Sequence, residues 1–197
     1  MQKYKISDNT SDEALIAMVK QDYEPALNTL MSRYKYKLFS FISRYVKDED
    51  AAYDILQETF IRLHFKADSY DTRYKFSTWL YQIAINLCRD WGRKNKIRQF
   101  LSLDAFINND SEETYHDIII DPSSNVEDLT DLKKNLKLLD KEIQKLPHNL
   151  KAALILFSIE ENSQEECAEI LGVTPKTVET RVYRARKILA EKIAKNF

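Results

Sequence analysis

Apolar residues recur at steps of three and four positions along several segments, the spacing that places them on one face of an α-helix. The first long segment covers about 23–46, with apolar positions at Leu27, Leu30, Tyr34, Leu38, Ile42 and Tyr45. A shorter helix is expected before it, starting at Ser11 with Asp12 and Glu13 in its first turn. A serine cap followed by acidic residues is favourable at a helix N-terminus.

Two more segments repeat the helical pattern. In 48–66, which opens with the acidic stretch "KDEDAAYD", the apolar positions are Ala52, Ile55, Leu56, Phe60 and Leu63. In 76–94 they are Phe76, Trp79, Leu80, Ile83, Ala84 and Leu87. The apolar faces of these helices are sufficient for one helical bundle.

The periodicity fails between 97 and 127, where "NNDSEETYHDIIIDPSSN" mixes turn-forming residues, acids and one short apolar run. This composition predicts a linker with little fixed structure. The helical pattern then returns at Leu132, Leu136, Leu139 and Ile143 and stops before Pro147. A further helix is expected over about 149–160.

The stretch that follows, "SQEECAEILGVTPKTVETRVYRARKIL", carries its own helix boundaries. Ser163 and Glu166 form a capping box for a short helix, and Gly172 can adopt the positive φ that ends it. Thr174 then caps a second helix that begins with Pro175, where a missing N–H has little cost. Two helices joined by a short glycine turn predict a helix-turn-helix.

The second of these helices has two different faces. Val178, Val182, Ala185 and Leu189 form an apolar stripe. A solvated charged face is the ordinary explanation for basic residues on a helix, but the caps, the glycine turn and the phasing together favour DNA recognition. Arginine, lysine and threonine can bind phosphates or base edges. The expected DNA-binding residues are Lys176, Thr177, Thr180, Arg181, Arg184, Arg186 and Lys187.

The net charge of −1 hides an uneven distribution of charge along the 197 residues. Residues 1–96 carry 16 basic and 13 acidic side chains, residues 97–131 carry 1 and 9, and residues 132–197 carry 13 and 9. The acidic middle segment therefore masks two mildly basic blocks in the average.

Composition supports an all-α protein, because 2 Gly and 4 Pro are too few for turn-dense β architecture. The N-terminus is polar and no apolar run reaches 18 residues, so we expect no membrane insertion and a cytoplasmic location. Cys88 and Cys167 fall within helical apolar patterns and are expected to be buried free thiols.

Three motifs, in order, resemble those of extracytoplasmic-function (ECF) sigma factors, the promoter-recognition subunits of bacterial RNA polymerase. "DAAYDILQETFIRLH" resembles the polymerase-docking helix of that family, and "FSTWLYQIAINLCRDWGRK" resembles the segment that recognises and opens the minus-ten element. The helix-turn-helix resembles the domain that recognises the minus-thirty-five element. The resemblance covers nearly the whole chain.

The resemblance implies two small helical domains joined by an acidic flexible linker: region 2 at 11–96, the linker at 97–131 and region 4 at 132–195. It implies core RNA polymerase and promoter DNA, both duplex and melted, as partners, and an inhibitory anti-sigma factor. Asp54, Gln57 and Glu58 match the polymerase-docking motif. Phe76, Trp79, Asn86 and Arg93 match the minus-ten segment, and Arg181, Arg184 and Arg186 match the basic last helix. Glu179 and Thr180 depart from the usual basic residue and serine there.

Side chains around the 76–94 helix suit strand opening. Amides can pair with base edges, and arginines can bind the backbone phosphates. Aromatic faces can stack on unpaired bases, and each stacked base contributes roughly 1–3 kcal/mol. Phe76 and Trp79 lie on the apolar stripe and are expected in the core, which leaves Tyr70 and Tyr74 as the stacking candidates. The expected minus-ten residues are Tyr70, Arg73, Tyr74, Lys75, Gln82, Asn86, Arg89 and Arg93.

A partner is expected because a lone helix-turn-helix binds DNA non-specifically at roughly 10⁻⁴–10⁻⁶ M. The chain has no sustained heptad seam, so an obligate homo-oligomer is not expected. The three histidines, His64, His116 and His148, are far apart, and the sequence has no glycine-rich phosphate loop or nucleophile motif. We therefore expect no catalytic site, metal or cofactor. A stand-alone DNA-binding regulator and a protein-interaction adaptor remain the alternatives.

Overall fold

The computed structural model describes residues 6–103 and 126–194, with the side chains of 98–103 and 126–134 excepted. Within those ranges the chain forms eight α-helices, one short 3-10 helix and no strand, which confirms the all-α prediction. The helices are α1 (Asp12–Val19), α2 (Glu24–Val46), α3 (Glu49–Phe65), η1 (Ala67–Ser69), α4 (Phe76–Leu103), α5 (Val126–Gln144), α6 (His148–Ser158), α7 (Gln164–Leu171) and α8 (Pro175–Ala194).

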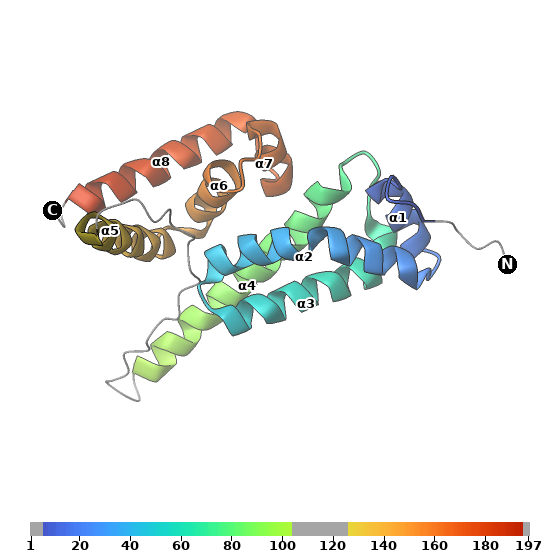
Figure 1. Ribbon diagram of the computed structural model, residues 1–197, viewed down its shortest axis with the longest axis horizontal. Coiled ribbons are helices and arrows are strands. Elements are labelled where there is room, and N and C mark those ends of the chain that lie inside the picture. Colours follow the sequence, from blue (N-terminus) through green and yellow to red (C-terminus); the bar gives the residue numbers. More distant parts are fainter. Residues whose placement is uncertain (1–5, 104–125, 195–197) are drawn as a thin grey trace.

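The first group of helices, α1 to α4, is a small bundle in which α2, α3 and α4 run alongside one another (Figure 1). Its core is apolar, with Leu30, Leu38, Phe41, Phe76 and Leu80 wholly buried. These residues come from the periodic stripes of 23–46 and 76–94, apart from Phe41, which lies next to Ile42 on the same helix. The hydrophobic pattern therefore identified the buried faces of these helices.

Local signals set most of the helix starts. The side chain of Ser11 accepts a hydrogen bond from the backbone N–H of Ala14, and that of Asp48 accepts one from Ala51. Both caps satisfy an N–H group that the helix itself leaves unpaired. The predicted first turn of α1 is confirmed, and α3 starts within the predicted acidic stretch.

The helices on either side of the expected linker are longer than predicted. α4 continues to Leu103 instead of ending near residue 94, and α5 begins at Val126 instead of 132. In the sequence, Ile97 and Leu101 follow at helical spacing after α4's apolar stripe, and Val126 and Leu129 precede that of α5. The prediction gave these positions too little weight against the polar residues around them. The rest of the expected linker, 104–125, lies outside the described residues.

The second group, α5 to α8, contains the helix-turn-helix as predicted. Both hydrogen bonds of the capping box between Ser163 and Glu166 are present, and Gly172 ends α7 with φ 63°. Thr174 accepts a hydrogen bond from the backbone N–H of Thr177 at the start of α8. The apolar stripe of α8 is buried, namely Val178, Val182, Ala185 and Leu189.

The two groups of helices pack against each other, an arrangement that the sequence pattern did not predict. α7 contacts the first turns of α4, and α6 contacts α2 (Figure 1). Ion pairs cross the interface at the C-terminal end of α2, where Arg44 meets Glu160 and Lys47 meets Asp140, each at 2.7 Å. The structure therefore joins the two expected domains into one closed unit.

Both cysteines are buried and free, as predicted. Burial raises the pKa of the Cys88 and Cys167 thiols to about 12, so both are neutral at physiological pH. No helix in the described part of the chain is long and apolar enough to cross a membrane.

We expect Gly172→Ala to lower the free energy of unfolding by roughly 1–2 kcal/mol, because a side chain at φ 63° strains the backbone although no atom blocks it. Gly92 is the matched control: it lies inside α4, and again nothing occupies the space of a Cβ atom. Gly92→Ala should raise the free energy of unfolding by roughly 0.5–1 kcal/mol. Urea denaturation measures both free energies of unfolding. If the two substitutions changed this free energy equally, the result would contradict this account of the α7–α8 turn.

Candidate nucleic-acid interface

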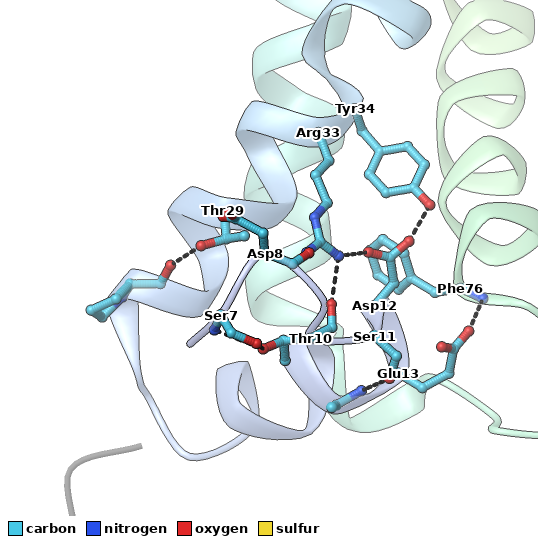
Figure 2. Close-up of polar contacts among 12 residues, drawn as sticks. Ser7, Asp8, Thr10, Ser11, Asp12, Glu13, Thr29, Arg33, Tyr34 and Phe76 are labelled. Atoms are coloured by element: carbon cyan, nitrogen blue, oxygen red, sulfur yellow. Dashed lines mark hydrogen bonds and ion pairs between the residues drawn. The ribbon is translucent and has the colours of Figure 1, made fainter. Parts of the chain in front are cut away.

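The loop that leads into α4 is held in place by α1 (Figure 2). The carboxylate of Glu13 accepts a hydrogen bond from the backbone N–H of Phe76 at 3.4 Å, and so caps the start of α4. Lys20 Nζ reaches the backbone oxygen of Tyr70 at 3.4 Å. The loop carrying the expected aromatic and basic residues is thereby fixed at both its beginning and its end.

α1 is itself anchored to α2 by Arg33, whose guanidinium donates to the backbone oxygens of Asp8 and Thr10 and to the carboxylate of Asp12 (Figure 2). Tyr34 donates to the same carboxylate. Burial and this hydrogen bond raise the pKa of Tyr34. The sequence analysis missed this role of Arg33, and no local signal reveals it because the partners lie more than 20 residues away.

The two stacking candidates in the loop differ in exposure. Tyr70 is only 4% exposed, its hydroxyl donates to the backbone oxygen of Tyr74 at 2.7 Å, and its ring packs against Phe76 and Trp79. Tyr74 is 49% exposed. In this conformation Tyr74 is open to a base, whereas Tyr70 could stack on one only after the loop moves. Phe76 is buried in the core and Trp79 packs against it, as predicted.

The basic residues of this loop are paired with acids. Arg73 is highly exposed and binds Asp71, which lowers the pKa of the Asp71 carboxyl. Lys75 forms an ion pair at 2.9 Å with Glu166 of α7. The partner of Arg73 is local, whereas that of Lys75 lies in the second group of helices.

The expected minus-ten face of α4 is divided into a covered part and an open part. Gln82 donates through Nε2 to the backbone oxygen of Glu169 on α7 at 2.9 Å. Further along α4, Asn86, Arg89 and Arg93 are exposed. Arg89 donates to the side chain of Asn86, and Arg93 to that of Asp90, each at 2.7 Å.

On α8 most of the expected DNA-binding residues line one groove. Lys176, Thr177, Thr180, Arg181 and Arg184 share it with Asn149, Leu150 and Thr174. The sequence analysis missed Asn149, which the packing of α6 brings to this groove.

The two remaining residues of the expected set lie outside this groove. Lys187 is exposed. Arg186 donates to the hydroxyl of Ser158 at 3.0 Å and lines a neighbouring groove with Tyr183. Lys176 lines both grooves and pairs with Glu179 at 2.9 Å.

The expected polymerase-docking residues lie on the outer side of α3. Asp54 and Gln57 are exposed, and Glu58 is partly exposed and paired with Arg62 at 2.7 Å. The same helix exposes Ile61 and Phe65, at 50% and 80%. The sequence analysis did not single out these two apolar residues, although they continue the spacing of Asp54 and Glu58 along the helix.

Comparison with known proteins identifies the family. Residues 30–97 match the family model for sigma-70 region 2, and residues 136–189 match the model for sigma-70 region 4. The ECF RNA polymerase sigma-E factor of Haemophilus influenzae is 32% identical over 200 residues, which cover 95% of this chain and 98% of the relative. The sigma-E factor of Escherichia coli K12 is 31% identical over 192 residues, covering 95% and 97%.

Two solved structures share the fold. CnrH, in complex with the cytosolic domain of CnrY, superposes with a TM-score of 0.66 at 22% identity, covering 95% of this chain and all of CnrH. The sigma factor RpoE of Bartonella quintana, crystallised with the anti-sigma factor NepR, gives 0.61 at 23% identity, covering 85% and 96%.

The two family matches fall on the two groups of helices, and the relatives match along almost their entire length. The predicted resemblance is therefore confirmed. The chain belongs to the sigma-70 family, as an ECF sigma factor that binds core RNA polymerase and directs transcription initiation at promoters.

Proposed function

We propose that the two groups of helices divide promoter recognition between them. Residues 11–96 form a domain that docks on polymerase and recognises and opens the minus-ten element. Residues 132–195 form the domain that recognises the minus-thirty-five element, and the acidic segment 97–131 connects the two. The observation that carries this proposal is the groove of α8, where three cations and three threonines gather beside a buried apolar stripe.

The groove fits duplex DNA. Arg181 and Arg184 lie one turn apart on the same face of α8, and an arginine can bind guanine through two parallel hydrogen bonds. Thr177 and Thr180 are close to them and can bind bases or phosphates. Lys187 extends the basic surface by a further turn. Arg186 is bonded to Ser158 on another flank, so we assign it to phosphate contact or to packing.

In the first domain, the open part of α4 and the adjoining loop would bind the melted strand. Asn86, Arg89 and Arg93 present an amide and two guanidinium groups along one exposed stripe. Tyr74 offers an exposed ring for base stacking. Tyr70, Arg73, Lys75 and Gln82 would join this surface once their present contacts are released.

The polymerase would bind the outer side of α3. Asp54, Gln57 and Glu58 supply acidic and amide groups, and their exposure leaves them accessible to a partner. Ile61 and Phe65 would add apolar contact area at the C-terminal end of the same surface.

The protein would act as a non-catalytic subunit in the cytoplasm, with catalysis supplied by the polymerase. Among the described residues, no three or more side chains are grouped in a way that could hold a metal ion. An anti-sigma factor is a further proposed partner, since the similar RpoE was crystallised with one.

Run-off transcription with purified bacterial core polymerase tests the function. Templates can be obtained by selecting duplexes from a random library with the reconstituted complex. We expect initiation from discrete sites that depends on both this protein and the core enzyme. Specific duplex binding by the protein alone, with no initiation when core is added, would instead indicate a stand-alone regulator.

Asp54→Arg is expected to weaken polymerase capture about 10-fold or more, because it reverses an exposed charge within the proposed docking surface. Glu191→Arg is the matched control, an exposed acid near the end of α8. Titration of labelled core polymerase measures capture, and thermal melting verifies that both variants are folded. Equal affinity of the two variants for core would refute the docking assignment.

Arg184→Ala should cost roughly 1–3 kcal/mol in promoter binding by the reconstituted complex and relax the preference at one base pair, if Arg184 contacts a base. A phosphate contact would instead weaken binding to all sequences equally and lower the salt dependence by about one counterion. Lys141→Ala, on α5, removes one exposed cation of the same domain outside the groove and serves as the control. If the Arg184→Ala complex binds the promoter as tightly as the Lys141→Ala complex, Arg184 does not lie in the interface.

A further inference from the structure

Helix α4 begins without a capping side chain of its own. The first backbone N–H groups of a helix have no partner inside it, and the residue before the helix usually supplies an acceptor. That residue is Lys75. Its backbone oxygen accepts a hydrogen bond from the N–H of Trp79 at 3.3 Å, but its side chain can only donate. The start of α4 therefore depends on an acceptor from elsewhere in the fold.

Glu13 of α1 supplies this acceptor from 63 positions away in the sequence (Figure 2). Its carboxylate accepts a hydrogen bond from the backbone N–H of Phe76 at 3.4 Å. A negative charge at this end of a helix is also favourable for the helix dipole. The side chain of Glu13 is exposed, so it fills no space in the core, and its contribution to the fold of α4 lies in this contact.

The helix that carries Glu13 is itself firmly held. Its neighbour Asp12 accepts a hydrogen bond from Arg33 of α2 at 2.7 Å, and Tyr34 of α2 donates to the same carboxylate (Figure 2). α4 packs against α2 as well. Glu13 therefore reaches the start of α4 from a backbone position that is fixed relative to the same bundle.

The loop at 70–75 has a closed shape that presents one aromatic ring. The backbone N–H of Tyr74 donates to the backbone oxygen of Asp71 at 3.1 Å, and the hydroxyl of Tyr70 donates to the backbone oxygen of Tyr74 at 2.7 Å. Both backbone groups of Tyr74 are thus held, while its side chain is 49% exposed. The direction of this ring is set by the shape of the loop.

α1 acts on the beginning of this loop as well as on its end. Lys20 Nζ donates to the backbone oxygen of Tyr70 at 3.4 Å. Burial raises the pKa of the Tyr70 hydroxyl, and the nearby carboxylates of Glu13 and Asp12 raise it further, so the hydroxyl remains a donor. Contacts from α1 therefore act at residues 70 and 76, on either side of the exposed ring.

We propose that Glu13 is a positioning residue for minus-ten recognition: from α1 it holds the loop at 70–75 in the shape that presents the ring of Tyr74 to an unpaired base. This inference rests on the proposed function of that loop. A loop that is already ordered spares base binding the entropic cost of fixing it. Without the contact from Glu13, part of that cost falls on the binding step, although the stacking ring itself is unchanged.

Binding of the melted minus-ten strand by the complex with core polymerase tests the proposal. The probe is a fluorescent single-stranded oligonucleotide that carries the non-template minus-ten sequence of a promoter selected with that complex. We expect Glu13→Ala to weaken its binding about fivefold. Glu13→Gln should stay within about twofold of the unaltered protein, because an amide oxygen can still accept the hydrogen bond from Phe76.

Ser11→Ala is the matched control. It removes another exposed polar side chain of the same segment, one that caps α1 itself, and so it weakens α1 without removing the contact to α4. We expect oligonucleotide binding to be unchanged in this variant. Core polymerase should be captured equally by the Glu13→Ala and Ser11→Ala variants, and thermal melting verifies that both are folded. Equal losses of oligonucleotide binding in the two variants would assign Glu13 to helix stability alone.

Combination with Tyr74→Ala tests whether Glu13 acts through the ring. If it does, Glu13→Ala should weaken binding less than twofold once the ring is absent. Lys20→Met is an independent test, since it removes the donor to Tyr70 and keeps the length of the side chain. Its effect should shrink in the same way, whereas a lysine that binds a phosphate directly would lose as much affinity in both backgrounds.

Two results separate this inference from the proposed function. If the unaltered complex prefers the minus-ten oligonucleotide to a scrambled one and Glu13→Ala has no effect, or its loss persists in full with Tyr74→Ala, the positioning role is refuted and the proposed function stands. If the unaltered complex shows no such preference, the proposed minus-ten surface fails, and the role of Glu13 fails with it.

Discussion

The burial of α2 on more than one side is the constraint on which the rest of the structure depends. α2 packs against α1, α3 and α4 within its own group of helices and against α6 of the other. Leu30, Leu38, Phe41 and Ile42 are wholly buried along it, and burial of such side chains is worth about 1.5–3 kcal/mol each. Near its C-terminal end, Tyr45 is 4% exposed and contacts both Phe41 and His148. One helix thus organises the first bundle and also receives the second.

The middle and the end of α2 fix different parts of the functional surface. In the middle of α2, Arg33 and Tyr34 hold α1, and α1 in turn caps α4 through Glu13 (Figure 2). At its end, exposed carbonyl groups accept donors from the second group of helices. The first set of contacts is within one bundle and gives the loop before α4 a defined shape. The second set is polar and peripheral, and contacts of this kind can be exchanged for contacts with a partner.

Agreement between sequence and structure was best where the signal was local. Ser11, Asp48, Ser163 and Gly172 mark helix ends through bonds or backbone angles that involve residues at most four positions away. The apolar stripe of α8 is buried, as its helical spacing predicted. The opposite face of the helix lines the basic groove. Where apolar spacing persisted among polar residues, the prediction ended α4 too early and began α5 too late.

Periodicity and capping were enough to predict the helices, the helix-turn-helix and the residue types available for DNA and polymerase, because both act over a few residues. Which of those residues are exposed depends on how the helices pack in three dimensions. Lys75 meets Glu166 across 91 positions and Tyr45 meets His148 across 103, and no spacing rule predicts such pairs. Tyr70, placed by the sequence among the stacking residues, is buried by the fold, while Asn149 is brought into a groove that the sequence did not assign to it. Long-range packing determines which residues are exposed and which are buried, since it depends on how whole helix faces fit together.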